Sequence, residues 1–237
     1  NFVGRLNDMY LICMKGYYNM DLTSPRTIRN IQEQFGFTFK KGLGQNFLTA
    51  RNILEEIVDA AEIESGVIEV GPGFGVLTSE LAQNSDKVVT IEIDERLIDV
   101  LDYTLAEYDN VKIINEDILK LDLKKVIDDE FNGEKVSIAA NLPYYITTPI
   151  ITKLLEEKLP IKNIVVMVQK EVAERMSAKP STKDYGAITV LCQYYTEPSI
   201  VADVPASLFV PPPKVDSAVL KLKVLDCLLY TSDAADD

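Results

Sequence analysis

A glycine-rich turn and two acidic residues follow three successive apolar segments of the sequence. Gly71 and Gly73 stand directly after the apolar residues 67–70, in the run Gly71-Pro72-Gly73-Phe74-Gly75. Glycine lets the backbone turn sharply and approach a ligand closely at the end of a strand. The spacing differs from the Gly-x-Gly-x-x-Gly of dinucleotide-binding proteins. The turn alone is a weak signal, because a plain strand-to-helix connection without any ligand is the alternative.

The two acids make that plain interpretation weaker. Glu92 follows the next apolar segment, 21 residues after Gly71, and Asp117 follows the third. An acid at the first of these places accepts hydrogen bonds from ribose hydroxyls in nucleotide-binding α/β sheets, and Asp117 can accept one from an adenine amino group. Together with the adjoining Ile93 and Ile118, these features predict a ligand with an adenosine part and a separate amino-acid part, namely S-adenosylmethionine. The alternative for each acid is a helix cap.

A fourth apolar segment ends in Asn141-Leu142-Pro143-Tyr144. The amino nitrogen of adenine is a poor nucleophile because its lone pair is delocalised into the ring. The Asn141 side-chain oxygen and the Leu142 carbonyl can accept its two hydrogens, while Pro143, with its fixed φ, aims them. Tyr144 can stack on an extruded base, and Phe209 can close its other face. The plain alternatives are a capped turn with a core tyrosine and a proline-rich turn.

Composition restricts the chemistry further. The chain of 237 residues contains no histidine, which removes the usual general base and the usual metal ligand. Its three cysteines lack metal-ligand spacing, so no metal is expected. The net charge of −13 argues against a nucleic-acid partner, unless local groups of lysine and arginine provide the contacts. No apolar run is long enough to span a bilayer, so we expect a cytoplasmic protein without a membrane partner.

The elements that must position these residues alternate between two patterns. Short apolar segments at residues 67–70, 88–91, 111–114, 136–139 and 164–168 predict strands, and periodic segments at 25–34, 53–61, 77–82, 96–105 and 149–155 predict helices. Residues 187–195 and 217–222 are expected to add two strands. This alternation predicts a doubly wound α/β domain of the Rossmann-like class I methyltransferase type. Its sheet should have seven mostly parallel strands with an antiparallel edge strand.

The two ends of the chain lack such patterns. Residues 1–19 show no periodicity and are interpreted as a non-native leader, with a flexible natural extension as the alternative. Residues 226–237 are interpreted as an adapter-derived tail. The methyltransferase domain is therefore expected to occupy residues 20–225.

The ordered motifs resemble those of the ribosomal RNA adenine dimethyltransferases, and especially the bacterial KsgA-type branch that acts on the small subunit. The resemblance rests on the runs 44–48, 69–75, 91–94, 141–145, 169–172 and 209–217. It implies that Gln45, Asn46 and Leu48 join the cofactor contacts together with Gly71, Glu92, Asp117 and Asn141. It also implies dimethylation of two adjacent adenines near the 3′ end of 16S rRNA, in a 30S subunit or its precursor, by a monomeric enzyme. Members of this family continue into a small helical C-terminal domain, which is expected to be absent here.

Three other functions remain open at this point. The nearest is the related 23S rRNA adenine methyltransferase branch that confers macrolide resistance. A nonenzymatic assembly or transcription factor can share the fold, and a DNA adenine methyltransferase can share the Asn-x-Pro-Tyr chemistry.

Overall fold

Seven strands form one sheet in the computed structural model, which describes residues 20–36 and 46–225. The sheet order is β4-β3-β2-β5-β6-β9-β7. Its strands are β2 (Val67–Val70), β3 (Val88–Glu92), β4 (Val111–Asn115), β5 (Val136–Asn141), β6 (Ile161–Gln169), β7 (Thr196–Val204) and β9 (Ser217–Val224). The first five strands in this order, β4, β3, β2, β5 and β6, are parallel to one another, and β9 runs antiparallel to both β6 and β7. The predicted fold class is confirmed, and the reversed strand β9 lies second from the edge.

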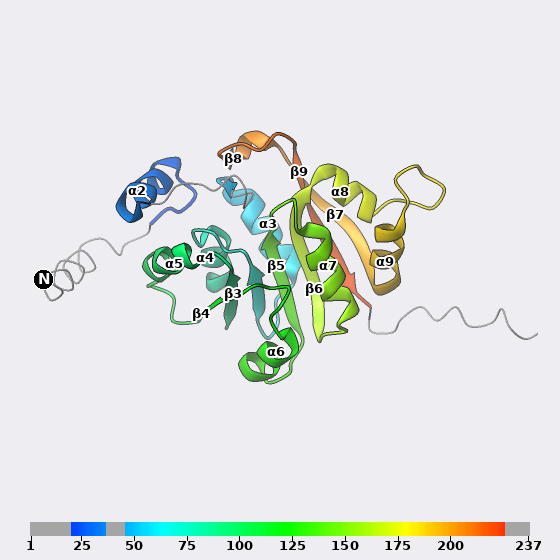
Figure 1. Ribbon diagram of the computed structural model, residues 1–237, viewed down its shortest axis with the longest axis horizontal. Coiled ribbons are helices and arrows are strands. Elements are labelled where there is room, and N and C mark those ends of the chain that lie inside the picture. The colour runs from blue at the N-terminus through cyan, green and yellow to red at the C-terminus, as the bar shows by residue number, and fades with distance from the viewer. Residues whose placement is uncertain (1–19, 37–45, 226–237) are drawn as a thin grey trace, which may run out of the picture.

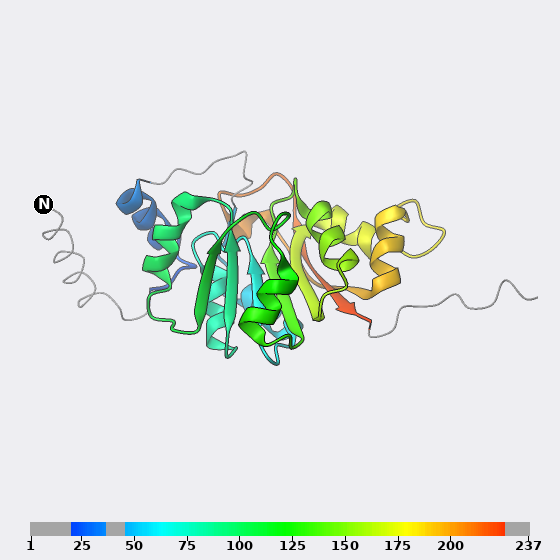
Figure 2. The same cartoon turned by 60° about the horizontal axis from the view of Figure 1, so that its bottom comes forward.

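Helices cover both faces of the sheet (Figures 1 and 2). They are α2 (Pro25–Phe35), α3 (Arg51–Ala61), α4 (Val76–Gln83), α5 (Ile98–Thr104), α6 (Leu123–Phe131), α7 (Thr147–Glu156), α8 (Lys170–Met176) and α9 (Ala187–Tyr195), with short 3-10 helices η2 (Glu95–Leu97) and η3 (Ala206–Leu208). Neighbouring residues of one strand serve opposite cores, because side chains alternate along a strand. Val67 packs with α3, α4 and α5, whereas Ile68 packs with α6 and α7 on the other face.

The strand order reverses at β2 and β5. From β2 the chain builds outward through β3 and β4, and it then returns to place β5 on the other side of β2. The loops that leave β2 and β5 therefore diverge at the carboxyl edge of the sheet. Ligands of open α/β sheets bind in the crevice at such a point.

A second, two-stranded sheet closes over this edge. β1 (Phe47–Leu48) pairs antiparallel with β8 (Phe209–Val210), so that Leu48 lies opposite Phe209. The backbone N–H of Thr49 donates to the Leu208 carbonyl at 2.9 Å, and the Thr49 hydroxyl donates to the same oxygen at 2.8 Å. The segment before α3 is thus fastened to the proline-rich segment near the end of the domain.

The prediction of a strand at residues 187–195 is wrong, because this segment is helix α9. Thr189 and Cys192 are buried three residues apart, while Val190 and Tyr194 are exposed four residues apart. This is helical periodicity, although β-branched and aromatic residues had favoured a strand. The Thr189 hydroxyl also donates to the Arg175 carbonyl at 2.6 Å, which ties α9 to α8. The seventh strand is β7, directly after this helix.

Two kinds of feature are absent from the described residues, 20–36 and 46–225. No helix there combines the length and apolar character needed to cross a membrane. The same ranges hold no group of three or more cysteine, aspartate or glutamate side chains that could bind a metal ion.

Candidate active site

A pocket of about 1050 Å³, its open mouth included, lies at the carboxyl ends of β2, β3, β4 and β5. Residues from loops far apart in the sequence meet there because parallel strands end at one edge of the sheet. The predicted site residues that line it are Asn46, Leu48, Gly71, Gly73, Glu92, Ile93, Asp117, Ile118, Asn141 and Pro143. Gln45, the remaining predicted cofactor contact, lies outside the described residues.

Gly73 forms the tightest part of the glycine-rich turn. Its φ is 60°, a left-handed conformation that other residues adopt only under strain. A Cβ atom at this position would lie 2.6 Å from Cε1 of Phe47. The Phe47 ring is itself stacked on Phe74, with 4.3 Å between the ring centroids and 7° between the planes. Residues 46–48, which include β1, line one side of the pocket and are called the β1 wall. A residue without a side chain is therefore required where the glycine turn meets this wall.

Glu92 ends β3 with its carboxylate facing the glycine turn. Its Oε1 accepts a hydrogen bond from the Asp94 backbone N–H at 2.8 Å, and its Oε2 accepts a longer one from the Gly73 N–H at 3.4 Å. Burial raises the pKa of this carboxyl above its ordinary value, and the two backbone donors oppose the rise. Each carboxylate oxygen has a second lone pair for a ligand hydroxyl. The geometry suits the predicted acceptor of ribose hydroxyls.

Glu69 is a second buried acid that the sequence reasoning did not assign to the site. It lies within β2 and lines the floor of the pocket, with only 1% of its surface exposed. The Thr78 hydroxyl donates to its Oε2 at 2.5 Å. Burial raises the pKa of Glu69 to about 8, so the side chain is largely protonated at neutral pH. The sequence does contain a signal for this role, because Glu69 is an acid inside the otherwise apolar segment 67–70.

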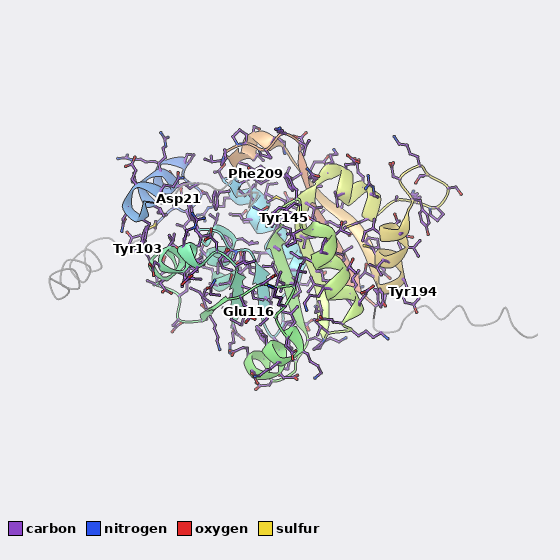
Figure 3. The ribbon with its side chains drawn as sticks, in the orientation of Figure 1. Asp21, Tyr103, Glu116, Tyr145, Tyr194 and Phe209 are labelled. Carbon is purple, nitrogen blue, oxygen red and sulfur yellow. The ribbon has the colours of Figure 1, made fainter. Side chains whose placement is uncertain are left out.

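Asp117 and its neighbour Glu116 approach the pocket from the loop after β4. Asp117 Oδ1 accepts a hydrogen bond from the Leu119 N–H at 3.0 Å, and its Oδ2 lies 3.6 Å from Nζ of Lys120. Asp117 thus caps a turn, as the plain interpretation required, and lines the pocket as well. Figure 3 shows Glu116 and Tyr145 toward the middle of the molecule.

Asn141, the last residue of β5, faces the pocket with a defined amide orientation. Its Nδ2 donates to the Asn46 carbonyl at 3.1 Å. A carbonyl oxygen only accepts, so Nδ2 must be the atom turned toward Asn46 and Oδ1 must point the other way. The hydrogen bond joins the β1 wall to the motif at 141–144 and presents an acceptor oxygen.

The loop after Asn141 is fastened to the sheet and to α7. Leu142 is buried, and its backbone N–H donates to the Met167 carbonyl at 3.2 Å. The Pro143 carbonyl accepts from the Ile146 N–H at 3.1 Å and from the Thr147 hydroxyl at 3.2 Å. This loop enters the pocket through Pro143, Tyr145 and Ile146.

The aromatic side chains of the site lie differently from the expectation. Tyr144 is half-buried and does not line the pocket, and its hydroxyl lies 2.8 Å from Oγ of Ser217. Phe209 is buried in β8 and packs in the core with Phe47, so in this structure it does not face the pocket. Tyr145 lines the mouth instead and is 59% exposed. Tyr144 was predicted because it belongs to the Asn141–Tyr144 motif, and a sequence motif does not give the direction of side chains in a turn.

The described residues that line the pocket carry acids but no lysine or arginine. The acids are Glu69, which is largely protonated at neutral pH, and Glu92, Glu116 and Asp117, which supply the negative charge. The pocket is thus suited to a cationic ligand and unsuited to a pyrophosphate, which needs positive charge or several backbone donors. Basic residues elsewhere are partly neutralised. Lys170 pairs with Asp203 at 2.9 Å, and Lys221 lies 2.6 Å from Glu62.

The chain is similar in sequence to known proteins. The family model described as "Ribosomal RNA adenine dimethylase" matches residues 36–233. A "Ribosomal RNA small subunit methyltransferase A" from Alkaliphilus oremlandii is 53% identical over 207 residues, which is 86% of this chain and 72% of that protein. The protein of the same name from Bacillus mycoides is 55% identical over 205 residues, covering 85% of this chain and 70% of that protein.

Solved structures lead to the same group. A dimethyladenosine transferase from Plasmodium falciparum is 35% identical with a TM-score of 0.66, covering 76% of this chain and 63% of that one. The 23S rRNA methyltransferase ErmE is 32% identical with a TM-score of 0.65, covering 77% of this chain and 71% of that one. The extent of the family match and the identity to these relatives establish that the chain belongs to the ribosomal RNA adenine dimethylase family.

Proposed function

We propose that this chain transfers methyl groups from S-adenosylmethionine to the exocyclic amino nitrogens of two adjacent adenines near the 3′ end of 16S rRNA. One observation carries the proposal. The glycine turn, Glu92 and Asp117 line the same pocket as Asn141, so residues suited to hold adenosine lie beside a side chain suited to accept a hydrogen bond from an amino group. The identity of 53–55% to small-subunit methyltransferases, against 32% to ErmE, favours the small-subunit RNA over the 23S alternative.

The residues of the pocket fit S-adenosylmethionine. Glu92 would hold the ribose hydroxyls, and Asp117 the adenine amino group. A Cβ placed on Gly71 would meet no atom within 4 Å, so the turn leaves open space beside the strand for the ligand. Glu92, Glu116 and Asp117 would balance the sulfonium and ammonium charges.

When bound, the cofactor supplies a methyl group on a positively charged sulfur. The chain's own contribution is to position the adenine amino group in front of it. Asn141 Oδ1 and the Leu142 carbonyl would accept hydrogen bonds from the two N–H groups of the amino nitrogen, and Pro143 keeps the loop rigid. The proton that the nitrogen loses once it is methylated would pass to water. Neither acceptor is a strong base. Catalysis by orientation agrees with a chain that contains no histidine.

The substrate particle and the state of the enzyme follow the same proposal. The RNA would be presented in a 30S subunit or its precursor, in the cytoplasm, to a monomeric enzyme. An adenine within a duplex cannot reach the pocket, so the target base must be unpaired or extruded. Tyr145 at the mouth offers a stacking surface for it or for a neighbouring base.

The decisive experiment uses purified 30S particles that lack the modification. The chain should transfer radioactive methyl groups from labelled cofactor to these particles, and nuclease digestion followed by mass spectrometry should yield N6,N6-dimethyladenosine. Glu92→Ala is the matched loss-of-binding control. 50S particles and single-stranded DNA serve as competing substrates.

Each alternative function has its own outcome. Transfer to 50S but not to 30S particles would favour the macrolide-resistance type of activity, and transfer to DNA would favour a DNA methyltransferase. Cofactor binding without transfer to any of the three substrates would contradict the proposed enzyme. Binding of 30S particles without cofactor binding would favour a nonenzymatic factor.

A further inference from the structure

Two motifs that are far apart in the sequence are joined by one side-chain hydrogen bond. The hydroxyl of Tyr144 lies 2.8 Å from Oγ of Ser217, and 73 residues separate them. Tyr144 belongs to the motif after β5, whereas Ser217 ends the proline-rich segment and begins β9. Ser217 is fully buried and Tyr144 is half-buried. The buried Ser217 hydroxyl therefore has a hydrogen-bond partner in the Tyr144 hydroxyl.

Ser217 is a fixed point in the fold. It is paired with Gln169 of β6 on one side and with Val204 of β7 on the other. Its neighbour Asp216 is held twice, because its carbonyl accepts from the Lys170 N–H at 3.0 Å and its Oδ1 accepts from the Ala206 N–H at 2.9 Å. The serine oxygen thus has little freedom to follow a moving partner.

Tyr144 stands in the segment that would orient the target amino group. Two hydrogen bonds fix the backbone on its N-terminal side. The Leu142 N–H donates to a carbonyl of β6, and the Pro143 carbonyl accepts from the Thr147 hydroxyl at the start of α7. The backbone contacts do not fix the side chain of Tyr144. Burial raises the pKa of its phenol above the ordinary value, so the hydroxyl is protonated at neutral pH and can donate a hydrogen bond. A hydrogen bond at the far end of the ring sets the ring's orientation, which backbone contacts alone do not.

We propose that Ser217 is a positioning residue for methyl transfer, which fixes the ring of Tyr144 through the hydroxyl–hydroxyl hydrogen bond. This inference rests on the proposed function. It predicts that Ser217 affects the transfer step without touching cofactor. The pocket residues that would hold the cofactor do not include it.

The test compares Ser217→Ala, Tyr144→Phe and the double variant in single-turnover methylation of the unmodified 30S particles. Each single variant should slow transfer on the order of tenfold, because one buried hydroxyl loses its partner. The double variant should be no slower than the worse single one, since both changes delete the same bond. The Kd for S-adenosylmethionine should change by less than about twofold. Additive losses, near a hundredfold, would overturn the inference.

A matched control separates positioning from general stability. Ser137 is a similarly buried serine near the start of β5, at the end of that strand away from Asn141. Its hydroxyl donates to the Ala61 carbonyl at 2.6 Å. Ser137→Ala should lower the free energy of unfolding as Ser217→Ala does, yet leave single-turnover transfer unchanged. Equal slowing in both variants would reduce Ser217 to a structural residue.

A spectroscopic measurement tests the contact without activity. With 3-fluorotyrosine at position 144, the fluorine NMR line of the full chain should shift or broaden in Ser217→Ala and stay unchanged in Ser137→Ala. An identical line in all three proteins would refute the inference. A wild-type chain that transferred no methyl group would instead refute the proposed function, and the fluorine spectra would still decide whether Ser217 holds the ring.

Discussion

Replacing Gly73 with alanine should damage both the fold and the pocket, and the structure separates the two causes. The new Cβ would lie 2.6 Å from Cε1 of Phe47, and the backbone would keep a φ of 60°. The left-handed conformation costs an alanine about 1–2 kcal/mol. Displacing a packed ring costs about 1–3 kcal/mol more. Gly73→Ala should therefore lower the free energy of unfolding by about 2–5 kcal/mol.

Gly36 provides the matched control. Its φ is 61°, it caps the end of α2, and a Cβ there would meet no atom within 4 Å. Gly36→Ala should lose only the backbone contribution, about 1–2 kcal/mol. Phe47 lines the pocket, so its displacement in Gly73→Ala should also weaken cofactor binding, whereas Gly36→Ala should not.

Urea-induced unfolding followed by circular dichroism measures the first quantity, and calorimetric titration with S-adenosylmethionine measures the second. Truncating the ring relieves the clash, so Phe47→Ala combined with Gly73→Ala should destabilise less than the sum of the single changes. Equal destabilisation by the two glycine replacements, together with strict additivity for the Phe47 pair, would refute the reasoning. In that case the Phe47 ring would move aside for the new Cβ atom without lowering the free energy of unfolding.

Three further predictions concern single side chains of the pocket. Glu92→Ala should weaken S-adenosylmethionine binding about 10- to 150-fold, because a charge-assisted hydrogen bond contributes about 1.5–3 kcal/mol; unchanged calorimetric affinity would remove Glu92 from the site. Tyr145→Ala should weaken binding of unmodified 30S particles about 5- to 100-fold through lost stacking, while Tyr194→Ala, the loss of an exposed tyrosine on α9, should have no effect in the same filter-binding assay. The pKa of Glu69 is about 8 in the folded chain against an ordinary value of 4.5. The folded state therefore holds a proton that the unfolded state has released, and stability should fall as pH rises from about 4.5 to about 8. Glu69→Gln should flatten this part of the urea-unfolding profile, and an unchanged slope would show that Glu69 does not cause it.

The central strands could be predicted because their sequence and their environment agree. Strand β2 begins and ends where the apolar run does, since both of its faces are covered by helices and every residue is buried. The same logic located the glycine turn and two of the acids that line the pocket, Glu92 and Asp117. Residues at the ends of parallel strands must meet, whatever their side chains do in detail.

The parts that the sequence did not reveal depend on tertiary contacts. Residues 187–195 are rich in strand-forming types, yet the segment is a helix that is fastened by Thr189 and packed through Cys192. The direction of Tyr144 is set by Ser217, 73 residues away, and no local pattern encodes that contact. The roles of the individual site residues remain predictions, to be decided by the variants above.

The pairing of β1 with β8 has a consequence in time. Thr49 is hydrogen-bonded to Leu208, 159 residues later in the chain. The pocket wall at residues 46–48 therefore lacks its pairing strand, β8, until that part of the chain has been synthesised. At synthesis rates of about 5–20 residues per second the interval is roughly 10–30 s. The glycine turn and Glu92 are complete long before it ends. A nascent chain would thus carry most of the cofactor contacts without the wall that encloses them, and tight cofactor binding should begin only when synthesis of the domain is nearly finished.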